Sequence, residues 1–505
     1  MRQLMYSFNG TTPPPEIIGA TGRGEVAAIC LFAHANVRSP AQVGELTTAL
    51  RQAALEGGHL PPIIGIDQEG GQLIAITTGA TALPGNMALG ATRSPELAEQ
   101  AGKVLGRELL AMGITMNFAP SVDVNVNPDN PVVGVRSFGD DPALVAELGA
   151  AMIRGIQSEG VLATAKHFPG HGDTAVDSHH DMQVVKHSIE RMHDVELRPF
   201  RAAIYAGVKA IMTAHILYSA LDDRNPVSLS KAILNGLLRQ EMGFNGLIIT
   251  DAMDMGAVSR LGERESVEAA LNAGTDLVLL GHLKNQLSLG QNTRDLQHED
   301  SLARIRDACQ FAPPNRPPFA VVGCTEHQQI AQQIADHSIT VVRDEGLLPL
   351  TLRPSQQIGV ITVTPTDLTP ADTSSGVKIQ LAENIRRRHD NILSLEMPYR
   401  ASDETIRGIV DAIRSSRVVV IGTIQADQDP SQAKLVQMLC ECGKDSIVVA
   451  LRTPYDLRAF PMVRTYLCAY GIRAVTVEAV ARVLFGEIDA KGVLPCAIPG
   501  ITDNR

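Results

Sequence analysis

The chain has 505 residues, which is too many for one hydrophobic core, so we expect two domains. Its formal net charge is −11 and no basic stripe occurs, which argues against nucleic acid or an anionic membrane as a partner. No run of about 18 apolar residues is present, so no membrane-spanning segment is expected. Residues 1–12 lack the pattern of a secretory signal, and the odd number of cysteines suggests no disulfide framework. Both features predict a cytoplasmic protein.

Over residues 1–282, short apolar runs alternate with amphipathic helical stretches, and polar residues follow the runs. The seven clearest runs are 27–32, 62–66, 114–118, 161–165, 210–213, 246–249 and 276–280, and an eighth is ambiguous. Helical stretches between them include 40–55, 95–112, 142–159 and 263–273. Strands that alternate with helices and end in polar residues predict an α/β fold, a (β/α)8 barrel of the TIM type. Its active site is expected at the carboxyl ends of the strands.

Residues 283–318 are polar and then proline-rich, which predicts a linker between the barrel (1–282) and a second domain (319–505). Strand-like runs return in that domain, at 319–322, 357–363, 391–395, 418–422, 446–451 and 464–469. Helical stretches separate several of them, which indicates an α/β domain with an open sheet. No glycine-rich dinucleotide or P-loop motif follows a strand, so we expect no nucleotide and no other cofactor.

The loop of residues 166–179 follows one of the predicted barrel strands and concentrates titratable side chains. Proline and glycine within it exclude a regular helix or strand, so the loop should have a set shape. Its titratable residues are Lys166, His167, His171, Asp173, Asp177 and His179. Such a group at the carboxyl end of a barrel strand predicts a catalytic site.

Two other interpretations of this loop remain open. Its side chains could be surface polarity without chemistry. They could also bind a metal, since His167, His171, Asp173, Asp177, His179 and His180 are all possible ligands. Their spacing matches no compact zinc pattern such as H-E-x-x-H. We therefore expect no metal, and keep a metal-dependent barrel hydrolase as an alternative.

Charged residues near the ends of several strands form a candidate site. They are Asp67, Arg136, Lys166, His167, Asp177, His179 and Asp251. Cations and carboxylates together suit a polyhydroxylated ligand, because sugar hydroxyls need charged or bidentate partners to fix one orientation. Asp251 ends a strand, where reacting atoms are held rigidly, so it is the candidate nucleophile.

Simpler interpretations exist for the same side chains. Asp251 could cap a helix, and residues 177–179 could form a turn. Arg136 and Lys166 could form structural ion pairs across the barrel mouth. We assign Asp123 a structural role only.

The sequence resembles glycoside hydrolase family 3, in particular its β-N-acetylglucosaminidase (β-N-acetylhexosaminidase) subgroup. The barrel segments that carry the resemblance are 66–71, 117–123, 130–139, 166–179 and 250–255. Those of the second domain are 338–342, 347–350, 450–457, 484–487 and 492–495. The resemblance implies the two-domain form, a (β/α)8 barrel followed by an αβα sandwich.

The resemblance also implies a role for each candidate residue. Asp251 corresponds to the nucleophile, His179 to the general acid/base, and Asp177 to the carboxylate that orients His179. The residues that hold the terminal N-acetylglucosamine are Asp67, Arg136, Lys166 and His167. Many relatives have arginine at two positions where this chain has Gln72 and Ala75, which leaves the contacts there uncertain.

The implied activity is the exo-acting, retaining removal of terminal β-linked N-acetylglucosamine by double displacement. Imidazole titrates near about pH 6.5, so His179 could both donate and accept the proton. Fragments of peptidoglycan or chitin are the expected substrates, and peptidoglycan recycling in the cytoplasm the expected context. A phosphorylase that uses inorganic phosphate remains an alternative, because a histidine repels an incoming anion less than a carboxylate does.

Overall fold

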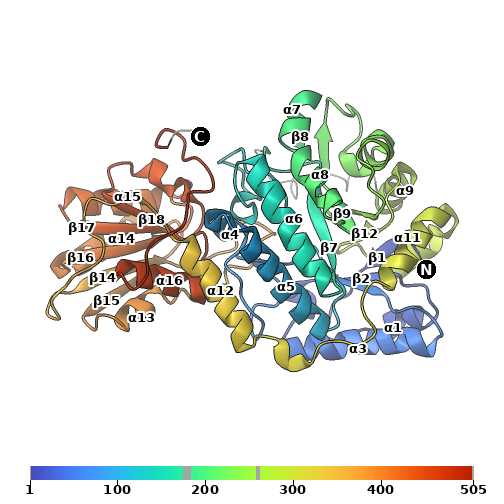
Figure 1. Ribbon diagram of the computed structural model, residues 1–505, viewed down its shortest axis with the longest axis horizontal. Coiled ribbons are helices and arrows are strands. Elements are labelled where there is room, and N and C mark those ends of the chain that lie inside the picture. The colour runs from blue at the N-terminus through green and yellow to red at the C-terminus, as the bar shows by residue number, and fades with distance from the viewer. Residues whose placement is uncertain (1, 175–182, 257–261, 503–505) are drawn as a thin grey trace.

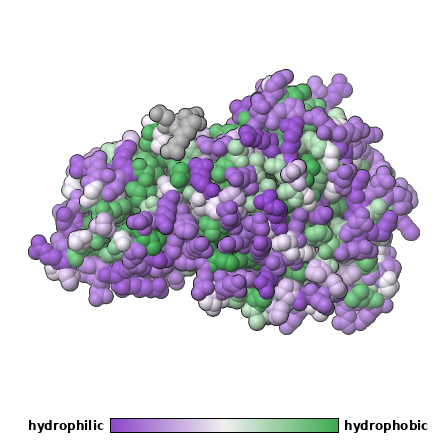
Figure 2. Space-filling model, viewed as in Figure 1, coloured by the Kyte–Doolittle hydropathy of each residue, from purple (hydrophilic) through white to green (hydrophobic). Residues whose placement is uncertain are grey.

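The computed structural model describes residues 2–174, 183–256 and 262–502. It shows two units side by side along the long axis of the molecule, a larger one built from the first part of the chain and a smaller one built from the last (Figure 1). Hydrophilic side chains cover most of the visible face of both units (Figure 2). No helix in the described ranges is long and apolar enough to cross a membrane.

The larger unit is the predicted (β/α)8 barrel. Its parallel strands are β1 (Leu4–Tyr6), β2 (Ala28–Leu31), β3 (Ile63–Ile66), β6 (Met116–Asn117), β7 (Leu162–Phe168), β9 (Ala210–Thr213), β11 (Leu247–Thr250) and β12 (Val278–Leu279). They pair in chain order, and β12 pairs with β1, Val278 opposite Leu4. A bridge between Leu277 and Ile249 closes the barrel.

The eighth strand, which the sequence left ambiguous, is β1. It has only three residues, all of them buried, so neither alternation nor length distinguishes it from a loop. The short pair β8 (Gln183–Val185) and β10 (Ile216–Tyr218) lies outside the barrel sheet.

The predicted barrel helices are confirmed. Three of them begin with a serine or aspartate N-cap that is followed directly by proline. The helices around the barrel are α1 (Pro15–Gly22), α3 (Pro40–Glu56), α5 (Pro95–Ala111), α6 (Pro142–Ser158), α7 (Ile189–Asp194), α8 (Leu197–Tyr205), η3 (Ala232–Glu241) and α9 (Glu263–Ala273). Ser39, Ser94 and Asp141 accept backbone N–H groups at the starts of α3, α5 and α6. Proline fits the next position because the first N–H of a helix has no partner within the helix.

The barrel interior is filled by side chains and closed at the amino ends of the strands by α11 (Glu299–Cys309). Ile305 and Ala308 of this helix pack into the same core as Met116 and Phe118. Gly65 is required there, since a Cβ atom would lie 2.6 Å from the Phe118 ring. Part of the segment expected to be a linker therefore packs on the barrel, and the domain boundaries at 282 and 319 stay a prediction.

The second domain is an αβα sandwich around a six-stranded sheet in the order β13-β18-β17-β16-β14-β15. The strands are β13 (Thr340–Arg343), β14 (Ile358–Val363), β15 (Ile392–Met397), β16 (Val418–Thr423), β17 (Asp445–Ala450) and β18 (Thr465–Cys468). Helices α12 (Thr325–Ser338), α13 (Leu381–Arg386) and α16 (Ala474–Leu484) pack together, and α14 (Asp403–Ala412) packs on α15 (Pro430–Glu441). The predicted sandwich is confirmed.

One predicted strand of this domain is wrong. Residues 319–322 begin with a single 3-10 turn, Phe319–Val321, placed directly after two prolines. Proline lacks the N–H needed for a strand ladder, and Phe319 remains 46% exposed. The edge of the sheet is formed instead by β13, which runs antiparallel to β18.

Candidate active site

A cavity of about 650 Å³ opens at the carboxyl ends of the barrel strands. Its wall is made by residues at or after the carboxyl ends of β2, β3, β6, β7, β11 and β12, together with residues 367–373 of the second domain. Cavities of about 300–1,000 Å³ are the usual size for small-molecule sites. The wall brings together five of the predicted site residues: Asp67, Arg136, Lys166, His167 and Asp251.

The buried carboxylate of Glu69 anchors the two cations of this site. Arg136 binds it with two parallel hydrogen bonds of 3.0 and 2.7 Å, from Nε and from a terminal nitrogen. Nζ of Lys166 lies 2.7 Å from Oε1 of Glu69 and 2.5 Å from Oδ1 of Asp67. The Asp67 side chain is 33% exposed, whereas Glu69 and Lys166 are each 2% exposed. Asp67 is therefore the carboxylate of this group that a ligand can reach.

Charge pairing keeps these groups ionised in spite of burial. Burial alone would raise the pKa of Glu69, but the positive charges of Arg136 and Lys166 lower that pKa to about 2. Burial would lower the pKa of Lys166, yet Asp67 and Glu69 raise it above its usual value. The ion pairs that were the simpler interpretation of Arg136 and Lys166 thus exist, and they also hold both cations in the cavity wall. Glu69, the shared partner of both cations, was not predicted to be a site residue, although it lies in segment 66–71, which carries the family resemblance.

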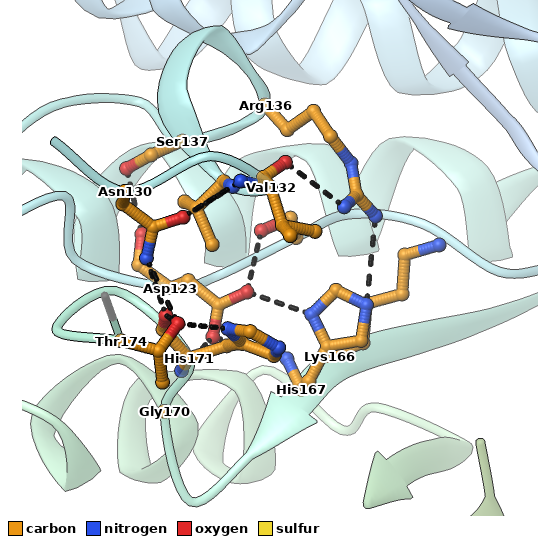
Figure 3. A network of polar contacts seen from close by, with 12 residues as sticks. Asp123, Asn130, Val132, Arg136, Ser137, Lys166, His167, Gly170, His171 and Thr174 are labelled. Atoms are coloured by element: carbon orange, nitrogen blue, oxygen red, sulfur yellow. Dashed lines mark hydrogen bonds and ion pairs between the residues drawn. The ribbon is translucent and has the colours of Figure 1, made fainter. Parts of the chain in front are cut away.

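Asp123 orients His167. Nδ1 of His167 donates to Oδ2 of Asp123 at 2.8 Å, and its backbone N donates to Oδ1 at 3.2 Å (Figure 3). The ring is thereby turned so that Nε2 lies 3.5 Å from a terminal nitrogen of Arg136. Burial would raise the pKa of Asp123, but His167 outweighs this and lowers it. The prediction gave Asp123 a structural role only, but its carboxylate orients a candidate site residue and so supports the site directly.

The predicted 166–179 loop begins too early, because Lys166, His167 and Phe168 still belong to β7, which pairs with its neighbours as far as Phe168. The part that follows the strand, residues 169–174, is fastened to residues 124–139. Nδ2 of Asn130 donates to the His171 carbonyl at 2.8 Å, and Oγ1 of Thr174 lies 2.8 Å from Nδ1 of His171 (Figure 3). Burial and the nearby His167 lower the pKa of His171 to about 4, so its ring is neutral near pH 7. A Cβ atom at Gly172 would lie 1.7 Å from the Val124 carbonyl oxygen, which explains the glycine. Asp177 and His179 lie outside the described residues.

Asp251 directly follows β11 and faces the cavity. Its backbone N donates to the Thr213 carbonyl at 3.1 Å, and Oδ1 accepts from the Ala252 backbone N at 2.8 Å. Helix α9 begins only at Glu263, so Asp251 does not cap it. The neighbouring Asp254 also lines the cavity, and its Oδ2 accepts from the His282 backbone N at 2.9 Å.

The second domain reaches the cavity through residues 367–373, which are fastened to the hairpin after β3. This hairpin consists of β4 (Gln68–Gly70) and β5 (Leu73–Ile74). The Gln72 side chain donates to the Ala371 carbonyl at 2.9 Å and accepts from Arg452 at 2.6 Å. Arg452 also binds Asp372 at 2.7 Å. Gln72 thus offers the oxygen that Arg452 needs, which an arginine at this position would lack.

Replacing Gln72 with arginine should weaken substrate binding. The change removes the acceptor for the buried Arg452 guanidinium and places a second cation beside it, a loss on the order of 1–3 kcal/mol. The displaced wall should raise KM on an aryl β-N-acetylglucosaminide by about tenfold and lower kcat less. Gln52→Arg, on the exposed face of α3, is the matched control. An unchanged KM in Gln72→Arg would show that residues 367–373 do not shape the site.

No group of three or more His, Cys, Asp or Glu side chains is arranged to hold a metal in the described part of the chain. His167 and His171 instead direct their Nδ1 atoms to Asp123 and Thr174. The metal-site alternative also involves residues 177–180, which lie outside the described ranges, so it stays open to experiment.

The barrel, its buried cation–carboxylate group and the aspartate after β11 define a class, the (β/α)8 barrel enzymes with their site at the carboxyl ends of the strands. The Glycosyl hydrolase family 3 N terminal domain matches residues 16–302, and the corresponding C-terminal domain matches residues 339–504. The chain therefore belongs to glycosyl hydrolase family 3 and is a glycoside hydrolase.

Two curated relatives match nearly the whole chain. Beta-hexosaminidase A of Pseudoalteromonas piscicida is 32% identical over 97% of this chain and 92% of its own length. Beta-N-acetylglucosaminidase/beta-glucosidase of Cellulomonas fimi is 29% identical, over 96% and 91%. Among solved structures, the family 3 beta-N-acetylglucosaminidase of Paenibacillus sp. str. FPU-7 superimposes with a TM-score of 0.91 at 35% identity, covering 99% of this chain and 98% of that one.

Proposed function

We propose that this glycoside hydrolase is an exo-acting, retaining β-N-acetylglucosaminidase. The observation that carries the proposal is the cavity in which Asp251 faces Asp67, Arg136, Lys166 and His167. The similarity to enzymes named beta-hexosaminidase and beta-N-acetylglucosaminidase supports the substrate class.

The cation–carboxylate group would hold the terminal sugar. Asp67 is exposed enough to accept hydrogen bonds from two hydroxyls, while Lys166 and Arg136 donate from positions fixed by Glu69. Such charge-assisted bonds hold the sugar in one orientation, so that its anomeric carbon meets Asp251.

Asp251 would attack the anomeric carbon and form a covalent glycosyl-enzyme, with departure of the leaving group. His179, oriented by Asp177, would protonate the departing oxygen and then take a proton from the water that attacks the intermediate. Two displacements at one carbon retain the β configuration.

Residues 367–373 support exo action. They are fastened to the β4–β5 hairpin, so they wall the cavity on the side where Asp67 and Arg136 lie. Such a wall would stop a sugar chain from continuing past the ring held by Asp67 and Arg136, so that ring would be the terminal one. Chitin or peptidoglycan fragments are the substrates we propose, with the reaction in the cytoplasm.

The test is the product formed from para-nitrophenyl β-N-acetylglucosaminide. We expect free N-acetylglucosamine, unchanged by added phosphate and by dialysis against a strong chelator. N-acetylglucosamine 1-phosphate as the product would identify a phosphorylase instead. Activity that disappears on chelation and returns with Zn²⁺ would identify a metal-dependent hydrolase. No turnover of this substrate by the unmodified enzyme would refute the proposal.

A further inference from the structure

A second group of side chains lines the cavity across the barrel from Lys166. Phe32 and His34 follow β2, and His282 follows β12. The His282 ring centroid lies 4.3 Å from that of Phe32 and 5.3 Å from that of His34. Both histidines are exposed and Phe32 is half-buried. The three rings form a contiguous aromatic rim, and none of them has a role in the chemistry proposed above.

Beyond this rim lies a second hollow of about 440 Å³, which His282 also lines. The hollow is formed by residues that follow β1 and β12 and by the start of α1, including Phe8, Asn9, Glu16 and Asn285. His282 borders both spaces, so the hollow adjoins the catalytic cavity. Figure 1 shows α1 at the end of the barrel remote from the second domain. The second domain therefore closes one side of the cavity, and the hollow lies on the opposite side.

Two buried amide side chains order the loops that carry the rim. Asn36 is fully buried, and it accepts from the Phe32 backbone N at 2.9 Å while donating to the Phe8 and Gly10 carbonyls at 2.9 and 3.0 Å. Gln286 accepts from the Ser7 backbone N at 2.7 Å and donates to the Gly281 carbonyl at 3.0 Å. The loops after β1, β2 and β12 are thus joined into one preformed surface.

The chemistry of this surface suits a sugar chain. A pyranose ring presents C–H groups on its face and hydroxyls at its edge, so it packs on an aromatic ring and hydrogen-bonds beside it. Partial burial and the adjacent His282 lower the pKa of His34, which makes its ring harder to protonate than a free imidazole. Exposed polar side chains in the hollow, those of Asn9, Glu16 and Asn285, are available for hydroxyls.

We propose that the aromatic rim and the hollow beyond it bind the second and third sugar rings of a β-linked oligosaccharide whose terminal ring occupies the catalytic cavity. The inference rests on the proposed function, because that function places the terminal sugar between Lys166 and Asp251. Asp251 follows β11, and His282 follows β12, the next strand of the barrel, so the rim borders the end of the cavity where the anomeric carbon would lie. The leaving group departs from the face of that carbon opposite Asp251, and the sugar rings attached to it would extend over the rim. The enzyme would then prefer oligosaccharides to small aryl glycosides.

The experiment measures kcat/KM for β-1,4-linked N-acetylglucosamine oligomers of two, three and four units and for the para-nitrophenyl monosaccharide. The unmodified enzyme should favour the tetramer over the dimer. His282→Ala should lower the ratio of tetramer to aryl glycoside by about tenfold, the effect of losing one ring stack. Ser288→Trp, which fills the hollow from an exposed position on α10 (Gln286–Asn292), should lower the ratio of tetramer to dimer.

His59→Ala is the matched control, since this exposed histidine lies before β3 at the opposite end of the barrel. It should leave every ratio unchanged. Equal kcat/KM for all oligomers in the unmodified enzyme, or ratios that survive both His282→Ala and Ser288→Trp, would overturn the inference. Either result with normal aryl glycoside turnover would leave the proposed function standing, whereas loss of that turnover in the unmodified enzyme would remove both.

Discussion

Asp251→Asn should abolish nearly all turnover while the protein remains folded. The amide keeps an oxygen to accept from the Ala252 backbone N, and the backbone bond to Thr213 is untouched, so the local structure should persist. An amide cannot form the glycosyl-enzyme, so the double displacement loses its first step. Steady-state kinetics on the aryl glycoside, with the melting temperature as the check on folding, measures the effect.

Asp254→Asn is the matched comparison, because Asp254 lines the same cavity three residues later. It should retain more activity than Asp251→Asn, since its carboxylate is engaged by the His282 backbone N. If Asp251→Asn keeps more than about a tenth of kcat, its activation free energy has risen by less than about 1.4 kcal/mol. That result would reject the assignment of Asp251 as the nucleophile. A larger loss in Asp254→Asn would move the assignment to that residue.

His179→Ala should damage the reaction in proportion to the proton transfer that each substrate needs. A sugar alkoxide leaves only if protonated, whereas dinitrophenolate needs almost no help. The loss should therefore be far greater on a natural disaccharide than on the activated aryl glycoside. On the activated substrate the glycosyl-enzyme should accumulate, because the attacking water lacks its base. Azide should restore this second step, since it needs no deprotonation, and the product should be a glycosyl azide.

Asp177→Asn should show a milder form of the same pattern, because the ring remains but loses its orienting charge. His180→Ala, the adjacent histidine, is the control and should not respond to azide. A uniform loss across all leaving groups without azide rescue would mean that His179 binds substrate or supports the loop. The acid/base would then have to lie elsewhere on the 166–179 loop.

The sequence predicted the barrel because its strands are apolar runs between amphipathic helices, a pattern carried by neighbouring residues. It could not reveal β1, whose three residues become a strand only through pairing with β2 and β12. Residues 319–322 were wrongly predicted to be a strand because they are apolar. An apolar run forms a strand only if a neighbouring strand is available to pair with it, and these residues have a 3-10 turn instead.

The candidate site likewise has one part that the sequence predicted and another that only the folded structure reveals. Asp67, Lys166, His167 and Asp251 lie in short motifs at strand ends, and Arg136 lies in a motif of the loop after β6, so motif and topology together predicted that they share one cavity. The wall formed by residues 367–373 was not predictable, because Gln72 and Arg452 are 380 residues apart and their bond exists only once both domains are in place. The ion pairs of Glu69 with Arg136 and Lys166, which come 67 and 97 residues later in the chain, likewise form only in the folded protein.

The place of α11 in the chain has a consequence for how the enzyme is made. Ile305 and Ala308 complete the barrel core, so the barrel cannot be fully closed until residue 309 has left the ribosome. The candidate site residues of the barrel are all synthesised before that point, yet the wall at 367–373 comes later still. Arg452, which holds the wall, comes last of all. A barrel emerging during translation would thus be folded before it is selective, and the enzyme would gain its finished pocket only near the end of synthesis.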